Sequence, residues 1–248
     1  MLQPWFVPLV DDPDRPVRVF AFPQAGGGCA TFGDCASRLN DRIAVYGLNL
    51  PGRQARFGEP PRTDLDSLVD DLVVGLGPLL DRPYVLLGYC SGAALAFRTA
   101  LALRAAGQPT PLGLLALSFS APQHTEPDTD LHTLPSELFW SHIVASGGFS
   151  EQLSAQPEFR EIFEPALRAD YELLAGYRYT PEPPLDTPIT VMVGKQDHGL
   201  HPAAVLGWGA QTTATCTVHM VDGDHWLLDS APDDIARAVE DTCRTSWS

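Results

Sequence analysis

The short segment Gly88–Gly92 carries the clearest chemical signal in the sequence. It reads Gly-Tyr-Cys-Ser-Gly, follows the apolar run Tyr84–Leu87, and precedes a stretch with helical spacing. This pattern is typical of a nucleophile elbow, a sharp strand-to-helix turn that exposes its central side chain. The central residue is Cys90, so the pattern predicts a nucleophilic thiol, whereas Ser91 stands one place too late for that role. The alternative is that Cys90 is only a small apolar residue packed at a glycine-rich turn.

A nucleophilic thiol needs a base to accept its proton and an acid to orient that base. Asp197 follows the apolar run Ile189–Val193 on a short loop, and His225 follows the run Cys216–Val221. The order nucleophile, acid, histidine is that of the α/β-hydrolases. We therefore expect a Cys90, Asp197, His225 triad at the carboxyl ends of the strands. Alternatively, Asp197 is a turn residue, and Asp222 or Asp224 orients the histidine locally.

Backbone N–H groups are the expected donors to the oxyanion that develops on a substrate carbonyl during attack by the nucleophile. The residue after the nucleophile normally supplies one donor, here the N–H of Ser91. The second is expected from the glycine-rich segment Pro23–Gly28, where either Gln24 or Ala25 is the candidate. This segment lacks the lysine of a P-loop and a complete Gly-x-Gly-x-x-Gly, so a phosphate site is not predicted. The alternative is a simple turn.

Composition limits the classes of function. The chain has 248 residues, a formal net charge of −15 and five cysteines with no Cys-x-x-Cys pair. Such charge disfavours nucleic acid and anionic membranes as partners, and an odd number of unpaired cysteines argues against disulfides and a zinc site. His198 and His201 have no further ligand at metal spacing, so we expect no metal. Neither a signal peptide nor a membrane-spanning run is evident, which favours the cytoplasm.

Apolar runs and helical segments alternate along the chain, which predicts an α/β fold with a mostly parallel sheet and helices on both faces. Strands are predicted at 17–22, 44–50, 84–88, 113–118, 189–193 and 216–221. Helices are predicted at 29–39, 65–80, 93–106, 203–210 and 233–244. We interpret residues 1–248 as one domain.

The stretch from about 134 to 179 interrupts this alternation. It contains helix-like pieces at 136–146 and 165–177 with no convincing strand between them. We interpret it as a helical lid, with a hinge or break at Gly147-Gly148. Aromatic residues of the lid, together with the tryptophan after His225, are candidates to line an acyl passage: Phe139, Trp140, Phe149, Phe163, Tyr171 and Trp226. The alternative is that the lid aromatics pack the lid onto the core.

The chain resembles the stand-alone type II thioesterases of polyketide and non-ribosomal peptide assembly lines over nearly its whole length. The similar motifs are Phe22–Gly27, Leu50–Arg56, Arg168–Tyr171 and Tyr177–Tyr179. The resemblance implies an α/β-hydrolase fold with a helical lid. It implies that Cys90, Asp197 and His225 are the members of the catalytic triad. It also implies that the substrate is an acyl or aminoacyl thioester on the phosphopantetheine arm of a carrier protein, with no cofactor bound by the enzyme itself. We expect a monomer that meets the carrier transiently.

One position departs from the family pattern. The family typically has Gly-His-Ser-Met-Gly at the elbow, where this chain has cysteine as the central residue. Acylation of Cys90 exchanges one thioester for another at nearly equal free energy, so the acyl group stays activated. The leading hypothesis is hydrolysis, and the runner-up is transfer of the acyl group to an amine or a second carrier thiol.

Two further alternatives remain at this stage. Dienelactone hydrolases also have a Gly-Tyr-Cys elbow, although the lid and the Pro51-Gly52-Arg53 loop argue against that family. A carrier-binding module without turnover is the non-enzymatic alternative. Arg53, Arg56 and Lys195 are candidates for a basic docking patch, or else for surface charges and structural ion pairs.

Overall fold

The structure is a computed structural model that describes residues 4–10, 12–149 and 151–244. Within these ranges the strands form a seven-stranded sheet in the order β1-β3-β2-β4-β5-β6-β7. Strand β1 runs antiparallel to β3, and the other neighbouring strands are parallel to each other. The strands are β1 (Phe6–Pro8), β2 (Val17–Phe22), β3 (Ile43–Leu48), β4 (Tyr84–Tyr89), β5 (Gly113–Leu117), β6 (Ile189–Gly194) and β7 (Cys216–Val221).

The predicted α/β architecture is confirmed, because each predicted strand is present with its ends moved by at most two residues. The central strands β2 to β5 are buried along their whole length. A parallel sheet covered on both faces requires such continuous apolar runs, which is why the sequence revealed them. Strand β1 was not predicted, because its three residues are too few to show a pattern.

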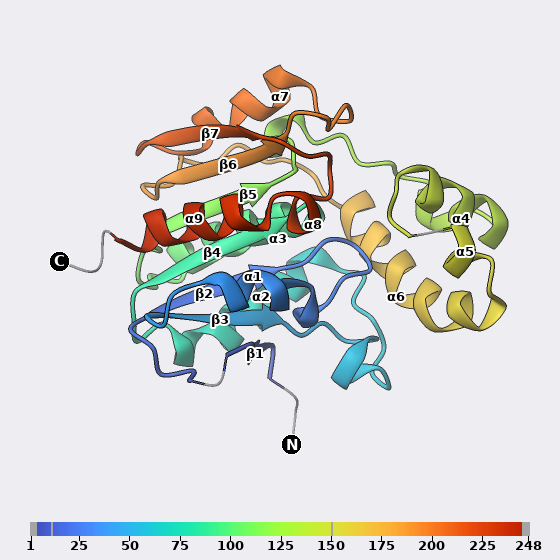
Figure 1. The fold of residues 1–248 in the computed structure, drawn as a ribbon, viewed down its shortest axis with the longest axis horizontal. Helices are drawn as coiled ribbons and strands as arrows, with labels where there is room; N and C mark the ends of the chain where they lie inside the picture. Colours follow the sequence, from blue (N-terminus) through green and yellow to red (C-terminus); the bar gives the residue numbers. More distant parts are fainter. Residues whose placement is uncertain (1–3, 11, 150, 245–248) are drawn as a thin grey trace.

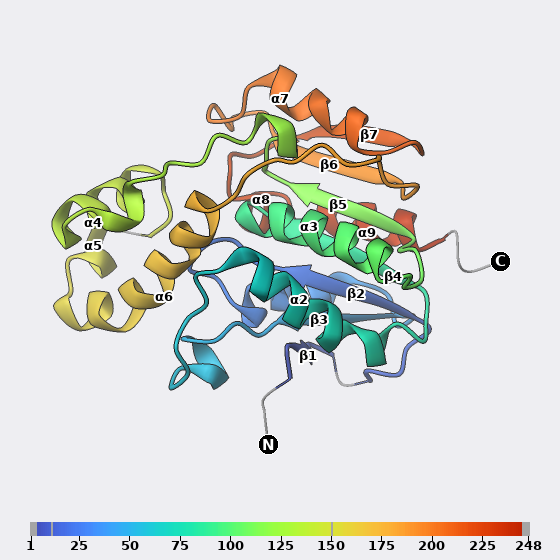
Figure 2. The ribbon, with the colours of Figure 1, turned by 180° about the vertical axis from the view of Figure 1, so that it is seen from behind.

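Alternating side chains of the strands enter two separate cores. Val85 and Leu87 face one core with helices α1 (Gly33–Arg38) and α9 (Pro232–Cys243), whereas Leu86 faces the other core with α2 (Leu65–Leu76) and α3 (Ser91–Ala105). Figure 1 shows α1 and α9 in front of the sheet, and Figure 2 shows α2 and α3 on the opposite face. Helices therefore cover both faces of the sheet, so a ligand is expected to bind at the carboxyl ends of the strands.

Three helices lie between β5 and β6 and project beyond the ends to which the strand arrows point (Figure 1). They are α4 (Ser136–Ala145), α5 (Glu151–Ser154) and α6 (Pro157–Ala175), and we call them the lid. The predicted helix at 165–177 proved to be the second half of α6, since Pro165 lies inside the helix. Proline is common at the first position of a helix, so the helix was predicted to begin at Pro165 rather than at Pro157.

The remaining helices are short. Helix α7 (Pro202–Leu206) follows β6, and α8 (Leu227–Ser230) lies between His225 and α9. Several predicted helices end in or begin with 3-10 turns, at Cys29–Phe32, Gly77–Leu79 and Gly207–Gln211. Across the described ranges, no helix combines the length and the apolar character that crossing a membrane requires.

Candidate active site

Cys90 occupies the sharp turn between β4 and α3. Its φ and ψ angles are 51° and −127°, a conformation that residues with a side chain rarely adopt. The Cys90 N–H donates to the carbonyl of Leu117 at 2.8 Å, and its own carbonyl accepts from the N–H of Ala93 at 2.8 Å. These two bonds fix the strained turn, and strain of this kind is typical of functional positions.

The two glycines of the elbow are required by backbone contacts. A Cβ atom on Gly92 would lie 2.1 Å from the carbonyl oxygen of Phe22, and one on Gly88 would lie 2.4 Å from the Cα of Ala93. Neither neighbour is a flexible side chain, so neither can move aside. The closeness of Gly92 to β2 also brings the start of α3 against the loop that follows β2.

His225 and Asp197 form the second part of the site. Asp197 Oδ2 lies 2.8 Å from His225 Nδ1, and the Asp197 side chain is only 3% exposed. His225 also forms a hydrogen bond with the side chain of Cys90. The three predicted triad residues thus form one continuous chain of contacts from three loops at the same edge of the sheet.

Electrostatics around His225 favour its protonated form. Burial acts against the charged imidazolium, but hydrogen bonds to Asp197 and Cys90, together with the charges of both groups, raise the pKa of His225 to about 10. The local alternatives for the orienting acid have other partners. Asp222 pairs with Lys195 Nζ at 2.7 Å, and Asp224 accepts from the N–H of Trp226 at 2.9 Å.

The backbone of His225 is held by two hydroxyl groups that sequence reasoning missed. Ser118 Oγ donates to the His225 carbonyl at 2.9 Å, and the Tyr89 hydroxyl donates to it at 3.2 Å. Both side chains are buried, and Ser118 has a φ of 50° directly after β5. The positive φ of Ser118 beside the loop of His225 is visible only in the structure, because backbone angles cannot be read from the sequence.

The candidate oxyanion loop is a tight turn from Gln24 to Gly27. Its closing bond runs from the Gly27 N–H to the Gln24 carbonyl at 2.9 Å, and Gly26 has the positive φ of 76° that such a turn demands. Gln24, Ala25 and Ser91 line the same pocket, so the residues that carry the candidate donors border one space. Ser91 begins α3, where backbone N–H groups have no partner within the helix.

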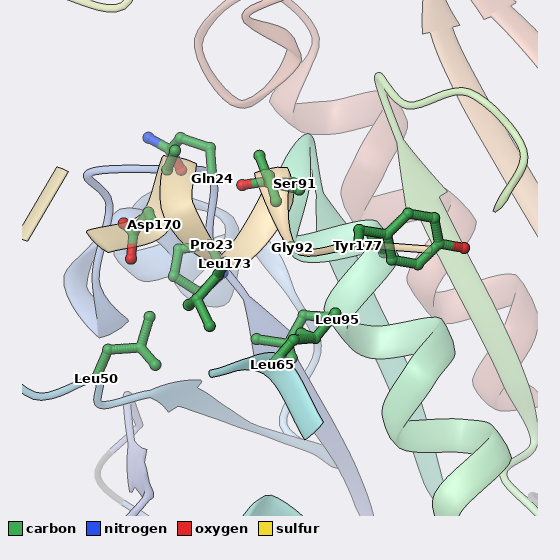
Figure 3. A pocket seen from close by; sticks show the side chains of 13 residues that line it. Pro23, Gln24, Leu50, Leu65, Ser91, Gly92, Leu95, Asp170, Leu173 and Tyr177 are labelled. Carbon is green, nitrogen blue, oxygen red and sulfur yellow. The ribbon is translucent and has the colours of Figure 1, made fainter. Parts of the chain in front are cut away.

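This pocket extends from the elbow between α3 and α6. Figure 3 shows Gln24 and Ser91 at one end and leucine side chains away from them. Its lining is mainly apolar, which suits an acyl chain. Sequence reasoning missed most of these residues: Leu50, Leu65, Leu95, Asp170, Leu173, Leu174 and Tyr177.

Comparison with known proteins identifies the family. The model of the thioesterase domain matches residues 17–243. The chain belongs to the thioesterase family. Among its relatives, the gramicidin S biosynthesis protein GrsT of Aneurinibacillus migulanus is 32% identical over 90% of this chain and 88% of its own. The medium-chain S-acyl fatty acid synthase thioesterase of Homo sapiens is 31% identical over 90% of this chain and 85% of its own.

Solved structures give the same assignment and confirm the predicted α/β-hydrolase fold. The thioesterase RedJ, from the prodiginine biosynthetic pathway in Streptomyces coelicolor, has a TM-score of 0.86 at 30% identity, covering 97% of this chain and 96% of its own. The type II thioesterase BorB, from the borrelidin biosynthetic cluster, has a TM-score of 0.87 at 28% identity, covering 96% and 97%. The protein is therefore a thioester hydrolase of this fold.

The aromatic residues predicted to line an acyl passage in this thioesterase have different environments. Phe139 and Trp140 are completely buried in a cluster inside the lid, which favours the packing alternative for both. Tyr171 packs edge-on against Phe139, with ring centres 5.9 Å apart. Phe149 contacts the candidate oxyanion turn (Gln24 to Gly27), since a Cβ on Gly26 would lie 3.5 Å from its ring. These four side chains thus belong mainly to the lid and its contact with the body.

Trp226 lies beside His225. Its ring is edge-on to the ring of His225, with centres 5.3 Å apart, and its Nε1 would lie 2.7 Å from a Cβ on Gly147. It therefore fills the space between the histidine loop and the Gly147-Gly148 turn after α4. Phe163, the remaining lid aromatic, is 38% exposed and lies against Phe149 and Phe159.

The residues considered for a basic docking patch have structural partners. Arg53 is buried against Asp170, and Arg56 is buried and pairs with Glu59. Lys195 is half exposed and pairs with Asp222, as described above. The ion-pair alternative therefore holds for the two arginines, which offer no exposed charge to a carrier protein.

Metal coordination gains no support from the placement of the histidines. His198 and His201 are exposed on the loop before α7, and His201 Nδ1 accepts the N–H of Ala203 at 3.3 Å. In the part of the chain that the structure describes, no three His, Cys, Asp or Glu residues are grouped in a way that holds a metal ion.

Proposed function

We propose that this thioesterase is a type II enzyme of non-ribosomal peptide or polyketide biosynthesis, which hydrolyses acyl or aminoacyl thioesters on the phosphopantetheine arm of carrier proteins. Support comes from relatives of nearly equal length whose names refer to such pathways, among them GrsT, RedJ and BorB. In this proposal the enzyme acts as a cytoplasmic monomer, holds no cofactor of its own and meets the carrier transiently.

The observation that carries the mechanism is the position of Cys90. Its side chain stands at the strained point of the elbow, in contact with His225, which is in turn bonded to the buried Asp197. The Ser91 hydroxyl belongs to the first residue of α3 and lies one position beyond the elbow. We therefore assign the nucleophile to Cys90 and retain Ser91 only as a backbone donor.

Acylation then proceeds in two steps. The Cys90 thiolate attacks the thioester carbonyl, and the negative oxygen of the tetrahedral intermediate is stabilised by the N–H of Ser91 and that of Gln24 or Ala25. The intermediate collapses with cleavage of the bond to the phosphopantetheine sulfur, which takes its proton from the His225 imidazolium. The carrier leaves with a free thiol, and the acyl group remains on Cys90.

Deacylation uses the same groups in the reverse sense. The now neutral His225 removes a proton from water, and the resulting hydroxide attacks the acyl-Cys90 carbonyl. The second tetrahedral intermediate expels the Cys90 thiolate, and the free acid departs. Asp197 keeps the imidazole oriented throughout by its bond to Nδ1.

Intact-protein mass spectrometry tests this assignment directly. Wild type, Cys90→Ser and Cys90→Ala are each mixed with an acyl-phosphopantetheinyl carrier protein. The masses of the enzyme and of the carrier are then measured over time. We expect an acyl adduct on wild type that decays to free acid, and neither an adduct nor loss of the acyl group from the carrier with Cys90→Ala. Unimpaired hydrolysis by Cys90→Ala would refute the cysteine nucleophile.

Because the proposed nucleophile is a cysteine, acyl transfer is a second candidate function. An acyl-Cys90 thioester stays activated, and amines and thiols attack thioesters well compared with water. The same experiment separates the two functions. An adduct that persists in buffer and disappears only after addition of an amine or a second carrier thiol would establish a transferase.

A further inference from the structure

A buried ion pair joins the lid to the oxyanion turn. Arg53 follows β3, and Asp170 lies on lid helix α6, 117 residues further along the chain. Arg53 Nη1 donates to Asp170 Oδ2 at 2.6 Å, and Arg53 Nη2 donates to Asp170 Oδ1 at 2.7 Å. Both residues are less than 10% exposed. Bidentate geometry and exclusion of water make this one of the strongest polar contacts available to a protein.

Each member of the pair also holds one peptide group of the turn. Asp170 Oδ2 accepts from the N–H of Gly26 at 2.7 Å, and Arg53 Nη1 donates to the carbonyl of Gly27 at 2.9 Å. The turn from Gln24 to Gly27 contains both candidates for the second oxyanion donor. Its orientation is thus fixed from two sides by charged groups.

Steric contacts keep the turn close to α6. A Cβ on Gly26 would lie 2.8 Å from Leu167 Cδ1, so the backbone of the turn packs directly on the helix. Arg53 Nη2 additionally donates to the carbonyl of Ala166 at 3.4 Å, one turn before Asp170. A displacement of α6 would therefore take away the acceptor of the Gly26 N–H and leave the buried guanidinium of Arg53 without its carboxylate.

We propose that Arg53 and Asp170 are positioning residues for the reaction: their ion pair clamps the oxyanion turn and makes its geometry depend on lid helix α6. The proposal rests on the proposed function, since it concerns attack of Cys90 on a thioester carbonyl. It predicts a specific loss. Breaking the clamp impairs stabilisation of the oxyanion while leaving Cys90 and His225 intact.

Two reactions of the same sulfur separate this role from a general structural one. Acylation by an acyl carrier protein passes through an oxyanion, whereas alkylation by iodoacetamide is a direct displacement that forms none. Loss of one oxyanion donor typically slows a reaction by about 10² to 10³. For Asp170→Asn we expect single-turnover acylation at saturating carrier to slow on the order of 10- to 1,000-fold, with alkylation of Cys90 unchanged.

A matched control lies on the same helix. Glu164 pairs with Arg168 at 2.6 Å and has no hydrogen bond to the oxyanion turn among the described contacts. Glu164→Gln makes the same carboxylate-to-amide change as Asp170→Asn. We expect it to retain the acylation rate of the wild type.

Removal of one member of a buried pair also destabilises the fold, so a double variant is needed. Arg53→Met with Asp170→Leu leaves no stranded charge, and we expect its melting temperature to recover relative to either single change. Its acylation is expected to stay slow, because Gly26 and Gly27 still lack their partners. Recovery of acylation together with stability would overturn the clamp, as would a parallel loss of acylation and alkylation. If the wild type itself forms no acyl-Cys90, the proposed function fails. That failure is distinguishable from failure of the clamp, because it is seen in the wild type before any variant is compared.

Discussion

Replacing Asp197 with asparagine removes a negative charge that lies 2.8 Å from His225 Nδ1 while keeping the size of the side chain. Burial opposes the imidazolium, yet hydrogen bonds and charges of Asp197 and Cys90 raise the pKa of His225 from 6.5 to about 10. That rise corresponds to roughly 5 kcal/mol of preference for the protonated ring. Asp197 shares this effect with Cys90, so the loss of its charge removes only part of it. We therefore expect Asp197→Asn to weaken the protonated form of His225 by about 1 to 3 kcal/mol, or roughly 5- to 150-fold.

The rate of Cys90 alkylation by iodoacetamide, followed by mass spectrometry at pH values from 6 to 10, measures this effect. We expect Asp197→Asn to slow alkylation near pH 7 by a factor in that range and to slow thioester hydrolysis at least as much. Asp224→Asn is the matched control, because Asp224 is adjacent to His225 in sequence but bonds only to the N–H of Trp226 among the described contacts. An equal loss in both variants, or none in Asp197→Asn, would refute the assignment of Asp197.

The same interaction makes stability depend on pH. Because the pKa of His225 is raised in the folded state, its stabilising contribution is fully present below about pH 6.5 and is lost as the pH rises towards 10. The difference in melting temperature between wild type and Asp197→Asn should therefore be largest at the acid end of this window and shrink towards pH 10. A difference that grew with pH would contradict the direction of the shift.

Three further outcomes are expected. Gly92→Ala places a Cβ 2.1 Å from a backbone oxygen. It should abolish hydrolysis and lower the stability of the fold by about 3 kcal/mol or more. Its control, Gly33→Ala, has no atom within 4 Å of the new Cβ and should leave thermal unfolding unchanged. Tyr89→Phe removes one of two hydroxyl donors to the His225 carbonyl and should cost about 1 kcal/mol of stability with a several-fold lower kcat. In peptide mapping after brief iodoacetamide treatment at pH 7, Cys90 should be alkylated first, because burial raises the pKa of each of the other four thiols: Cys29, Cys35, Cys216 and Cys243.

The elements that place the triad were predictable because their signals are local. Buried parallel strands must be apolar along their length, so β4, β6 and β7 were visible as runs that end just before Cys90, Asp197 and His225. The elbow was visible as two glycines around one side chain, and the structure gives the reason: a Cβ on either glycine would lie less than 2.5 Å from backbone atoms. Each of these features depends on only a few neighbouring residues.

Lid residues were predicted less well because the same composition permits several packings. Helical spacing indicated α4, but it did not show that Phe139 and Trp140 point into the lid rather than into an acyl passage. Pro165 suggested a helix start and instead lies within α6, which begins eight residues earlier at Pro157. Only the docking of the lid on the body decides which of its faces is covered.

The sequence alone determined the succession of strands and helices along the chain, the elbow and the three residues that meet at it, since apolar runs and turn chemistry are local features. The tertiary structure decided what holds those residues in place. The contact of Ser118 with the His225 carbonyl spans 107 residues, and that of Arg53 with Asp170 spans 117. No local pattern specifies such partners, because a buried charge or hydroxyl acquires its partner only when distant elements pack together and exclude water.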